Sequence, residues 1–189
     1  MDTILNVGVS LENLDEYKTF LGEACAIDCM NRLTKMMLST VLGAKEEHIY
    51  DDLDANLAAF EVYYLKGLPE RKEQIMLSVR AVFESWNNER AKYYRKMNNI
   101  PDDWGTAVII QRMVFGNLNN NSCTGVLFTR NPDNGDLELV GEYLPNAQGE
   151  DVVSGAVTPI DISVLAQEKP KLYKKLHTTV MKLEQTRVS

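Results

Sequence analysis

Apolar residues recur every three to four positions through the first half of the chain, the spacing of a buried helix face. The clearest case is Ala24–Leu42. A shorter helix is predicted over Leu11–Leu21, between Ser10 as a cap and Gly22 as a stop. In the longer stretch the apolar side chains share one face at Ala26, Met30, Leu33, Met37 and Val41.

The same spacing continues up to Pro101 and predicts three more helices. Short connections between such helices favour antiparallel neighbours, so we expect a helical subdomain over residues 1–97. Its Met-rich and aromatic stripes are expected to form a core. The apolar positions are Leu53, Leu57, Phe60 and Tyr64 in the first helix and Ile75, Val79, Val82 and Trp86 in the second, and the third helix is Glu89–Met97.

After Pro101 the pattern changes to short apolar runs separated by polar turns, which is typical of strands. Strands are predicted over Thr106–Phe115, Thr124–Thr129 and Leu137–Leu144. The first run is apolar on both faces, so we expect a central, covered strand. An amphipathic helix over Lys169–Gln185 follows, with inward positions at Leu172, Leu176, Val180 and Leu183. Residues 98–189 therefore form a predicted sheet subdomain, and the fold class is α+β.

Polar residues interrupt these strands at a few positions. Gln111 and Arg112 interrupt the first run. Buried polar side chains need partners, so both could bond neighbouring strands or loops. The alternative is that Gln111 faces a ligand. Thr124-Gly125 opens the second run, and a small hydroxyl followed by glycine lets backbone N–H groups approach a phosphate. Thr-Gly pairs are common, so this signal is weak by itself.

Carboxylates gather at the end of the third predicted strand. Glu142 lies between two apolar residues on one strand face, and the loop after Pro145 carries Gln148, Glu150 and Asp151. Mg²⁺ prefers hard oxygen ligands together with substrate phosphates, so this grouping suits Mg²⁺–nucleotide chemistry. The alternative is a solvated acidic turn.

Composition excludes some classes of function. Hydrophobic residues make up 44% of the 189, and the formal net charge is −7. An acidic chain without a basic stripe repels nucleic acid and anionic membranes. No apolar run approaches the roughly 20 residues of a membrane span, and the N-terminus lacks a signal-peptide pattern.

The chain has three cysteines, Cys25, Cys29 and Cys123. An odd number of cysteines far apart in sequence is not a disulfide framework, which favours a reducing, cytoplasmic setting. Neither His48 nor His177 belongs to a metal-ligand cluster.

Five motifs, in order, resemble the nucleotide-binding part of the pyruvate, phosphate dikinase family. The resemblance is dense over Ser85–Pro159 and thinner before it. It implies an ATP-grasp fold, of which this chain would supply the second half with a helical insertion. The five motifs are Ser85–Ala91, Asn98–Val108, Gln111–Asn117, Thr124–Pro132 and Gly141–Gly155.

The resemblance also implies a chemistry. Enzymes of this family transfer the β-phosphoryl group of ATP to a histidine on a separate domain, with phosphate as co-substrate and Mg²⁺ required. A barrel domain then makes phosphoenolpyruvate from pyruvate. The resemblance also allows for a homodimer of the full-length enzyme. Carried over to this sequence, the ATP-binding residues would be Gln111, Arg112, Met113, Thr124, Gly125, Glu142, Gln148 and Glu150, with no catalytic residue and no assigned metal ligand.

The chain also departs from the family pattern. The phosphate-clamping segments, the strand that carries the Mg²⁺ ligands, the histidine domain and the barrel are absent, so we expect an inactive fragment with weak ATP affinity. Cys123 replaces a usual glycine, and Pro145 replaces an apolar residue. Two other hypotheses remain: a non-catalytic interaction or regulatory module derived from a kinase subdomain, and a binding domain for another phosphorylated ligand.

Overall fold

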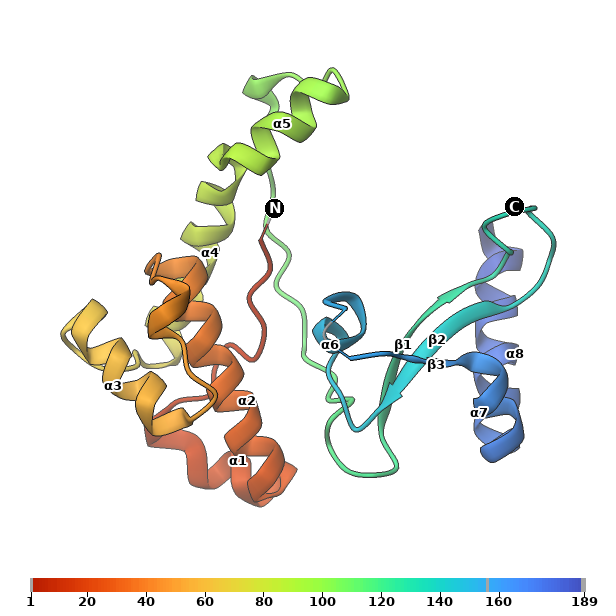
Figure 1. Cartoon of the computed structure of the whole chain (residues 1–189), viewed down its shortest axis with the longest axis horizontal. Coiled ribbons are helices and arrows are strands. Elements are labelled where there is room, and N and C mark those ends of the chain that lie inside the picture. The colour runs from red at the N-terminus through yellow and green to blue at the C-terminus, as the bar shows by residue number, and fades with distance from the viewer. Residues whose placement is uncertain (1, 156, 188–189) are drawn as a thin grey trace. The chain divides into compact units, whose positions relative to one another are not determined.

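The computed structural model describes residues 2–155 and 157–187. The chain divides into two compact units, Met1–Met113 and Val114–Ser189, which are described separately below. Figure 1 labels the helices and strands of both units. The subdomain boundary between residues 97 and 98, drawn from the change of hydrophobic pattern, stays a prediction.

The first unit is helical, as its apolar spacing predicts. Its helices are α1 (Leu14–Leu21), α2 (Glu23–Met36), α3 (Leu53–Tyr64), α4 (Arg71–Glu84) and α5 (Glu89–Met97). A 3₁₀ turn over Leu11–Asn13 precedes α1, and a π-helical turn over Met37–Val41 continues α2. The predicted helices over Leu11–Leu21 and Ala24–Leu42 are therefore each present, but each is built from two helical types.

The core of the helical unit lies between α2, the π-helical turn and α3. The predicted positions within α2 are buried, and α3, which packs against α2, contributes the buried Phe60. Cys25 and Cys29 lie on the same buried side of α2, with their sulfur atoms 4.0 Å apart, and burial raises the pKa of the Cys25 thiol. The side chains with no exposed surface in this core include Met30, Leu33, Met37, Leu38 and Phe60.

A buried glutamine fixes the segment before α1 to α4. The Gln74 side chain has no exposed surface. It accepts a hydrogen bond from the Gly8 backbone N–H at 2.8 Å and donates to the carbonyls of Val9 and Pro69, each at 2.7 Å. Buried polar groups need such partners because an unmade hydrogen bond in the interior is costly. Gln74 therefore ties the Gly8–Val9 segment to the start of α4 and the residue Pro69 just before it.

A buried arginine fixes the chain after α5. Arg95 is 4% exposed, and its Nε atom lies 2.6 Å from Asp102 Oδ1. Its guanidinium also donates to the Trp86 carbonyl and stacks over the Trp86 ring, 4.2 Å from the centroid. The planar guanidinium suits this combination of stacking and fork-like donation. Arg95 thus ties Trp86, before α5, to Asp102, after it, and the Trp86 Nε1–H donates to the Asp102 carbonyl as well.

The prediction of a strand over Thr106–Phe115 is wrong. These residues form no strand in the structure, and their apolar side chains are not covered: Ile109 is 87% exposed and Val114 is 85% exposed. Apolar alternation predicts a strand only if a second strand supplies the hydrogen-bonding ladder, because the pattern itself provides no partner. No described residue pairs with this segment in a sheet.

The second unit contains a three-stranded antiparallel sheet in the order β1-β2-β3. The strands are β1 (Cys123–Phe128), β2 (Val140–Pro145) and β3 (Ile160–Asp161). Opposite pairs include Val126 with Glu142, and Glu142 with Asp161. The prediction of a strand over Leu137–Leu144 is wrong at its start, because Leu137–Leu139 are irregular.

Three helices accompany the sheet: α6 (Gly149–Val153), α7 (Ile162–Glu168) and α8 (Pro170–Arg187). One face of the sheet, with Tyr143 at its centre, packs on Ile162 and Leu165 of α7 and on Tyr173 and Leu176 of α8. Leu172 and Leu183 of α8 are exposed, so their predicted inward orientation is wrong. The face of α8 that packs on the sheet begins with Tyr173, one residue after the predicted Leu172, because the large Tyr173 ring fills the space next to the sheet.

Candidate functional site

The other face of the sheet is open and carries two of the predicted ATP-binding residues. Because side chains alternate along a strand and opposite residues share a face, Thr124 of β1 and Glu142 of β2 lie on the same side. Thr124 is opposite Leu144, so Glu142 is its diagonal neighbour. The Glu142 side chain is exposed, and Phe128 on the same face is 51% exposed. This surface is therefore accessible to a ligand.

The open face is mostly apolar and carries no cation from these two strands. Its side chains from β1 and β2 include one carboxylate and one hydroxyl, and none is Lys or Arg. A triphosphate needs positive charge or metal ions to offset its own charge. These two strands alone do not provide it. The six side chains are Thr124, Val126, Phe128, Val140, Glu142 and Leu144.

Helix α6 covers one end of the open face and brings two more predicted residues beside Thr124. A small apolar cluster of Leu144, Ala147 and Val152 holds the helix on β2. The Gly149 Cβ position would lie 3.9 Å from Thr124 Oγ1, which places the start of α6 next to that hydroxyl. Glu150, in the first turn of α6, is half-buried.

Gln148 is almost fully buried, at 1% exposed, and is the N-cap residue of α6. Its backbone N–H donates to Asp151 Oδ2 at 2.8 Å, and its side chain accepts from the Asp151 backbone in return. This reciprocal capping satisfies donors that a helix start otherwise leaves unpaired. Gln148 and Asp151 thus define the start of α6, a structural task that their position in an acidic loop did not predict.

The glycine at Gly125 has a packing reason in the sheet. A Cβ atom there would lie 2.7 Å from the Glu142 carbonyl oxygen and 3.2 Å from Tyr143 Cβ. It would point to the packed face of the sheet, away from Thr124. The Thr-Gly pair is thus explained by close strand contact, and its predicted approach to phosphate stays a prediction.

The remaining predicted residues belong to the first unit. Gln111 and Arg112 are exposed and Met113 is half-buried, in the segment that forms no strand. The structure brings Thr124, Glu142, Gln148 and Glu150 to one side of the sheet unit, and it describes the other three within the helical unit.

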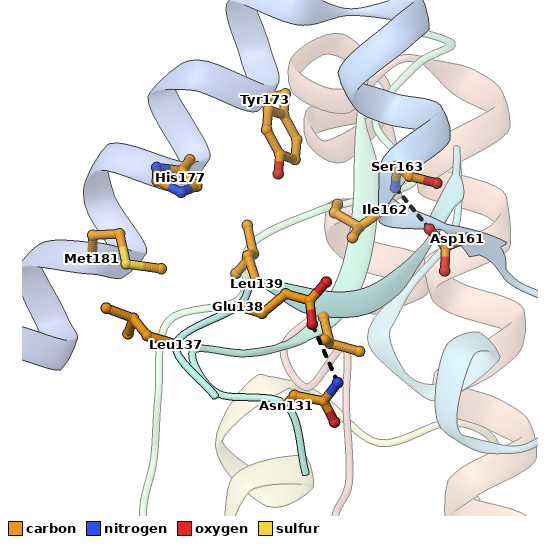
Figure 2. Close-up of a pocket in the computed structure, with 11 residues that line it drawn as sticks. Asn131, Leu137, Glu138, Leu139, Asp161, Ile162, Ser163, Tyr173, His177 and Met181 are labelled. Carbon is orange, nitrogen blue, oxygen red and sulfur yellow. Dashed lines mark hydrogen bonds between the residues drawn. The ribbon is translucent and has the colours of Figure 1, made fainter. Parts of the chain in front are cut away.

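A concave site in the sheet unit is formed by the start of β2 and the chain before it, the junction of β3 with α7, and α8. It has a volume of about 700 Å³, within the range of small-ligand pockets. Figure 2 shows α8 on one side and the chain leading into β2 on the other. None of the predicted ATP-binding residues lines it. The lining residues are Asn131, Leu137, Glu138, Leu139, Val140, Asp161, Ile162, Ser163, Tyr173, His177 and Met181.

Sequence reasoning missed this pocket because its residues are scattered over 50 positions and form no motif. Asp161 is held in place as the N-cap of α7, where its Oδ1 accepts from the Ser163 N–H at 2.8 Å. Hydrogen bonds from Ser163 hold the pKa of Asp161 below its usual value. Glu138 accepts from Asn131 Nδ2 at 3.2 Å. These residues lie beside α8 only in the folded chain, because they come from separate parts of the sequence.

Across residues 2–155 and 157–187, no group of three or more His, Cys, Asp or Glu side chains is arranged to hold a metal ion. The residues present therefore do not form a protein-only Mg²⁺ site. In the same part of the chain, no helix combines the length and apolar character of a membrane span.

Comparison with known proteins gives a consistent family. Pyruvate, phosphate dikinase of Clostridium symbiosum is 40% identical over 211 aligned residues, covering 97% of this chain and 24% of that protein. The Rickettsia typhi pyruvate, phosphate dikinase is 39% identical, covering 98% and 24%. The chloroplastic pyruvate, phosphate dikinase 1 of Zea mays is 40% identical, covering 93% and 21%.

The chain therefore spans about a quarter or less of the length of these relatives. The model of the family described as "Pyruvate phosphate dikinase, AMP/ATP-binding domain" matches residues 1–188. Because this match covers nearly the whole chain, the protein belongs to the pyruvate phosphate dikinase AMP/ATP-binding domain family.

Proposed function

We propose that this chain is an ATP-binding part of a pyruvate, phosphate dikinase-like phosphotransferase with an ATP-grasp fold. The complete enzyme would convert ATP, phosphate and pyruvate to AMP, diphosphate and phosphoenolpyruvate through a phosphohistidine on another domain. The observation that carries this proposal is the family match over residues 1–188. The open face of the sheet supports it, since this face holds the polar side chains Thr124 and Glu142.

The charge of that face supports a shared site rather than a complete one. Glu142 is exposed, and the β1 and β2 side chains around it include no cation. Mg²⁺ commonly binds through one or two carboxylates together with substrate phosphates and water. Glu142 would therefore face a magnesium–nucleotide complex, while the positive charge for the phosphates would come from other parts of the parent enzyme.

The residues proposed to line the nucleotide remain those of the sequence prediction. In the sheet unit they are Thr124, Gly125, Glu142, Gln148 and Glu150, and α6 joins the last two to Thr124. Gln111, Arg112 and Met113 are proposed to contact the nucleotide from their exposed segment. Phosphoryl transfer depends on positioning and charge neutralisation, so a chain with this partial set would bind ATP weakly and would not turn it over.

An NMR titration of the 189-residue chain with Mg²⁺–ATP tests the proposal. We expect shifts of the amide signals of Thr124 and Glu142 that saturate only above millimolar nucleotide. Glu142→Gln should weaken the binding by about two- to fivefold, the size of an exposed charge interaction. Glu138→Gln is the matched control, because it makes the same change four residues away, outside the open face.

The proposal fails if the open-face signals do not respond to Mg²⁺–ATP, or if the two Gln variants weaken binding equally. A Kd far below millimolar would contradict the shared-site part of the proposal, since it would mean that this chain alone neutralises the phosphates.

A further inference from the structure

The pocket between the start of β2 and α8 has a chemistry that differs from that of a nucleotide site. Of the eleven described residues that line it, two are carboxylates, one is histidine and none is Lys or Arg. A triphosphate would face two negative charges there with no cation to offset them, and this arrangement repels it. The pocket is therefore a poor site for the nucleotide of the proposed function.

The same lining suits a positively charged group with an apolar body. Glu138 and Asp161 lie on the side of β2 and β3, and Leu139, Ile162 and Met181 add an apolar wall. Tyr173 projects from α8 toward this space (Figure 2), with the His177 ring 6.1 Å from its own ring. An aromatic face beside carboxylates attracts cations through both the ring quadrupole and the opposite charge.

Both carboxylates are positioned and have capacity for a ligand. Asn131 bonds to Oε2 of Glu138, and Ser163 bonds to Oδ1 of Asp161, so each carboxylate is oriented through one oxygen. Among the described residues, neither carboxylate forms an ion pair. An ionised carboxylate accepts several hydrogen bonds, so each group keeps acceptor capacity beyond the bonds from Asn131 and Ser163. The lowered pKa of Asp161 means that this group is ionised at neutral pH.

We propose that this pocket binds a small organic cation, an ammonium group attached to an apolar or aromatic body. The ammonium group binds between Glu138 and Asp161, and the body lies against Tyr173 and the apolar wall. This site adjoins the open face, because Val140 borders both and Asp161 is opposite Glu142 in the sheet, but its lining contains none of the residues proposed to contact ATP.

Benzylammonium chloride is a suitable probe, and benzyl alcohol is its neutral counterpart of similar shape. The ¹⁵N-labelled 189-residue chain is titrated with each at constant ionic strength, following the amide signals of Glu138, Ser163 and His177. We expect saturable shifts with the cation and at least about two- to fivefold weaker binding of the alcohol, the factor that exposed charge interactions give.

Variants separate charge recognition from general adsorption. Glu138→Gln and Asp161→Asn should each weaken benzylammonium binding about two- to fivefold and leave benzyl alcohol binding unchanged. Both variants keep the local hydrogen-bonding pattern, since Gln still accepts from Asn131 and Asn is a good helix cap. Asp133→Asn, an exposed carboxylate in the neighbouring turn, is the control and should change neither ligand.

Three results would overturn the inference. The first is the absence of saturable shifts at the pocket signals with the cation. The second is equal binding of the alcohol and the cation, or unchanged cation binding in both pocket variants. The third is displacement of benzylammonium by Mg²⁺–ATP, which would join the pocket to the nucleotide site. The proposed function fails if the Thr124 and Glu142 signals do not respond to Mg²⁺–ATP, and this inference fails if the pocket signals do not respond to benzylammonium, so the two failures are distinguishable.

Discussion

At the scale of single residues, two positions determine local structure through contacts that the sequence pattern hides. Gly125 permits close pairing of β1 with β2, and the Gln74 side chain supplies hydrogen-bond partners to the backbone of Gly8, Val9 and Pro69. One position requires the absence of a side chain, and the other requires a particular arrangement of donors and acceptors. Substitutions at both should therefore cost stability for different reasons.

Gly125→Ala should destabilise the sheet unit by about 1–3 kcal/mol, the cost of inserting a methyl group into a packed region. The new Cβ would meet the Glu142 carbonyl oxygen at 2.7 Å, and a backbone atom cannot move aside as a side-chain end can. Gly149→Ala is the control, because its nearest contact is 3.9 Å away. Urea unfolding monitored by NMR signals of β1 and β2 measures both. Equal midpoints for the two variants would contradict the expectation.

Gln74→Leu should destabilise the helical unit by about 2–5 kcal/mol, since it leaves several buried polar groups without partners at about 1–3 kcal/mol each. The affected groups are the Gly8 N–H and the carbonyls of Val9 and Pro69. Gln111→Leu makes the same change at an exposed position and should alter stability by less than about 0.5 kcal/mol. Fluorescence of Trp86 and Trp104 during urea unfolding reports both. A small effect at Gln74 would mean that water replaces its contacts.

At the scale of elements, the sequence predicted those whose signals are local. Helix α5 has the predicted bounds, Glu89–Met97, because Asn88 caps it by accepting from the Ala91 N–H at 2.8 Å. The prediction of a strand over Thr106–Phe115 failed because a strand depends on a distant partner that no local pattern reveals. The pocket was missed for the same reason, since its two carboxylates and Tyr173 meet only after α8 packs on the sheet.

The cap of α7 makes a prediction about pH. Ser163 lowers the folded-state pKa of Asp161 below the ordinary value of 3.8, so ionised Asp161 favours the folded state. That stabilisation is fully present above about pH 4 and is lost as the pH falls through the lowered folded-state pKa. Asp161→Asn keeps a cap but has no charge to titrate. Its difference in urea midpoint from the unmodified chain should therefore be largest near neutral pH and shrink in acid.

Asp133→Asn, which removes an exposed carboxylate from the turn before β2, is the matched control for that series. The midpoints of α7 signals should show less pH dependence in Asp161→Asn than in this control. A constant difference between pH 7 and pH 3 would show that the cap acts through its shape and hydrogen bonds alone.

At the scale of the whole molecule, the division into two units gives the exposed segment around Arg112 a measurable property. The first unit ends at Met113, and residues 106–115 form no helix or strand. No backbone hydrogen bond joins this segment to another described segment. Segments with few contacts open at almost no free-energy cost and are cleaved first. Trypsin should therefore cut after Arg112 before it cuts within α2 or α8, giving products of residues 1–112 and 113–189.

Arg112→Gln should remove this first cut without changing the later ones, which mass spectrometry of a digestion time course detects. The same experiment distinguishes the strand predicted over Thr106–Phe115 from the exposed, irregular segment seen in the structure. If Thr106–Phe115 were a covered central strand, as its apolar residues predict, the bond after Arg112 would be protected by the sheet ladder and would be cleaved only with global unfolding. Early cleavage at Arg112 agrees with the exposed Ile109 and Val114 side chains. Protection there would mean that the segment pairs with a strand in solution.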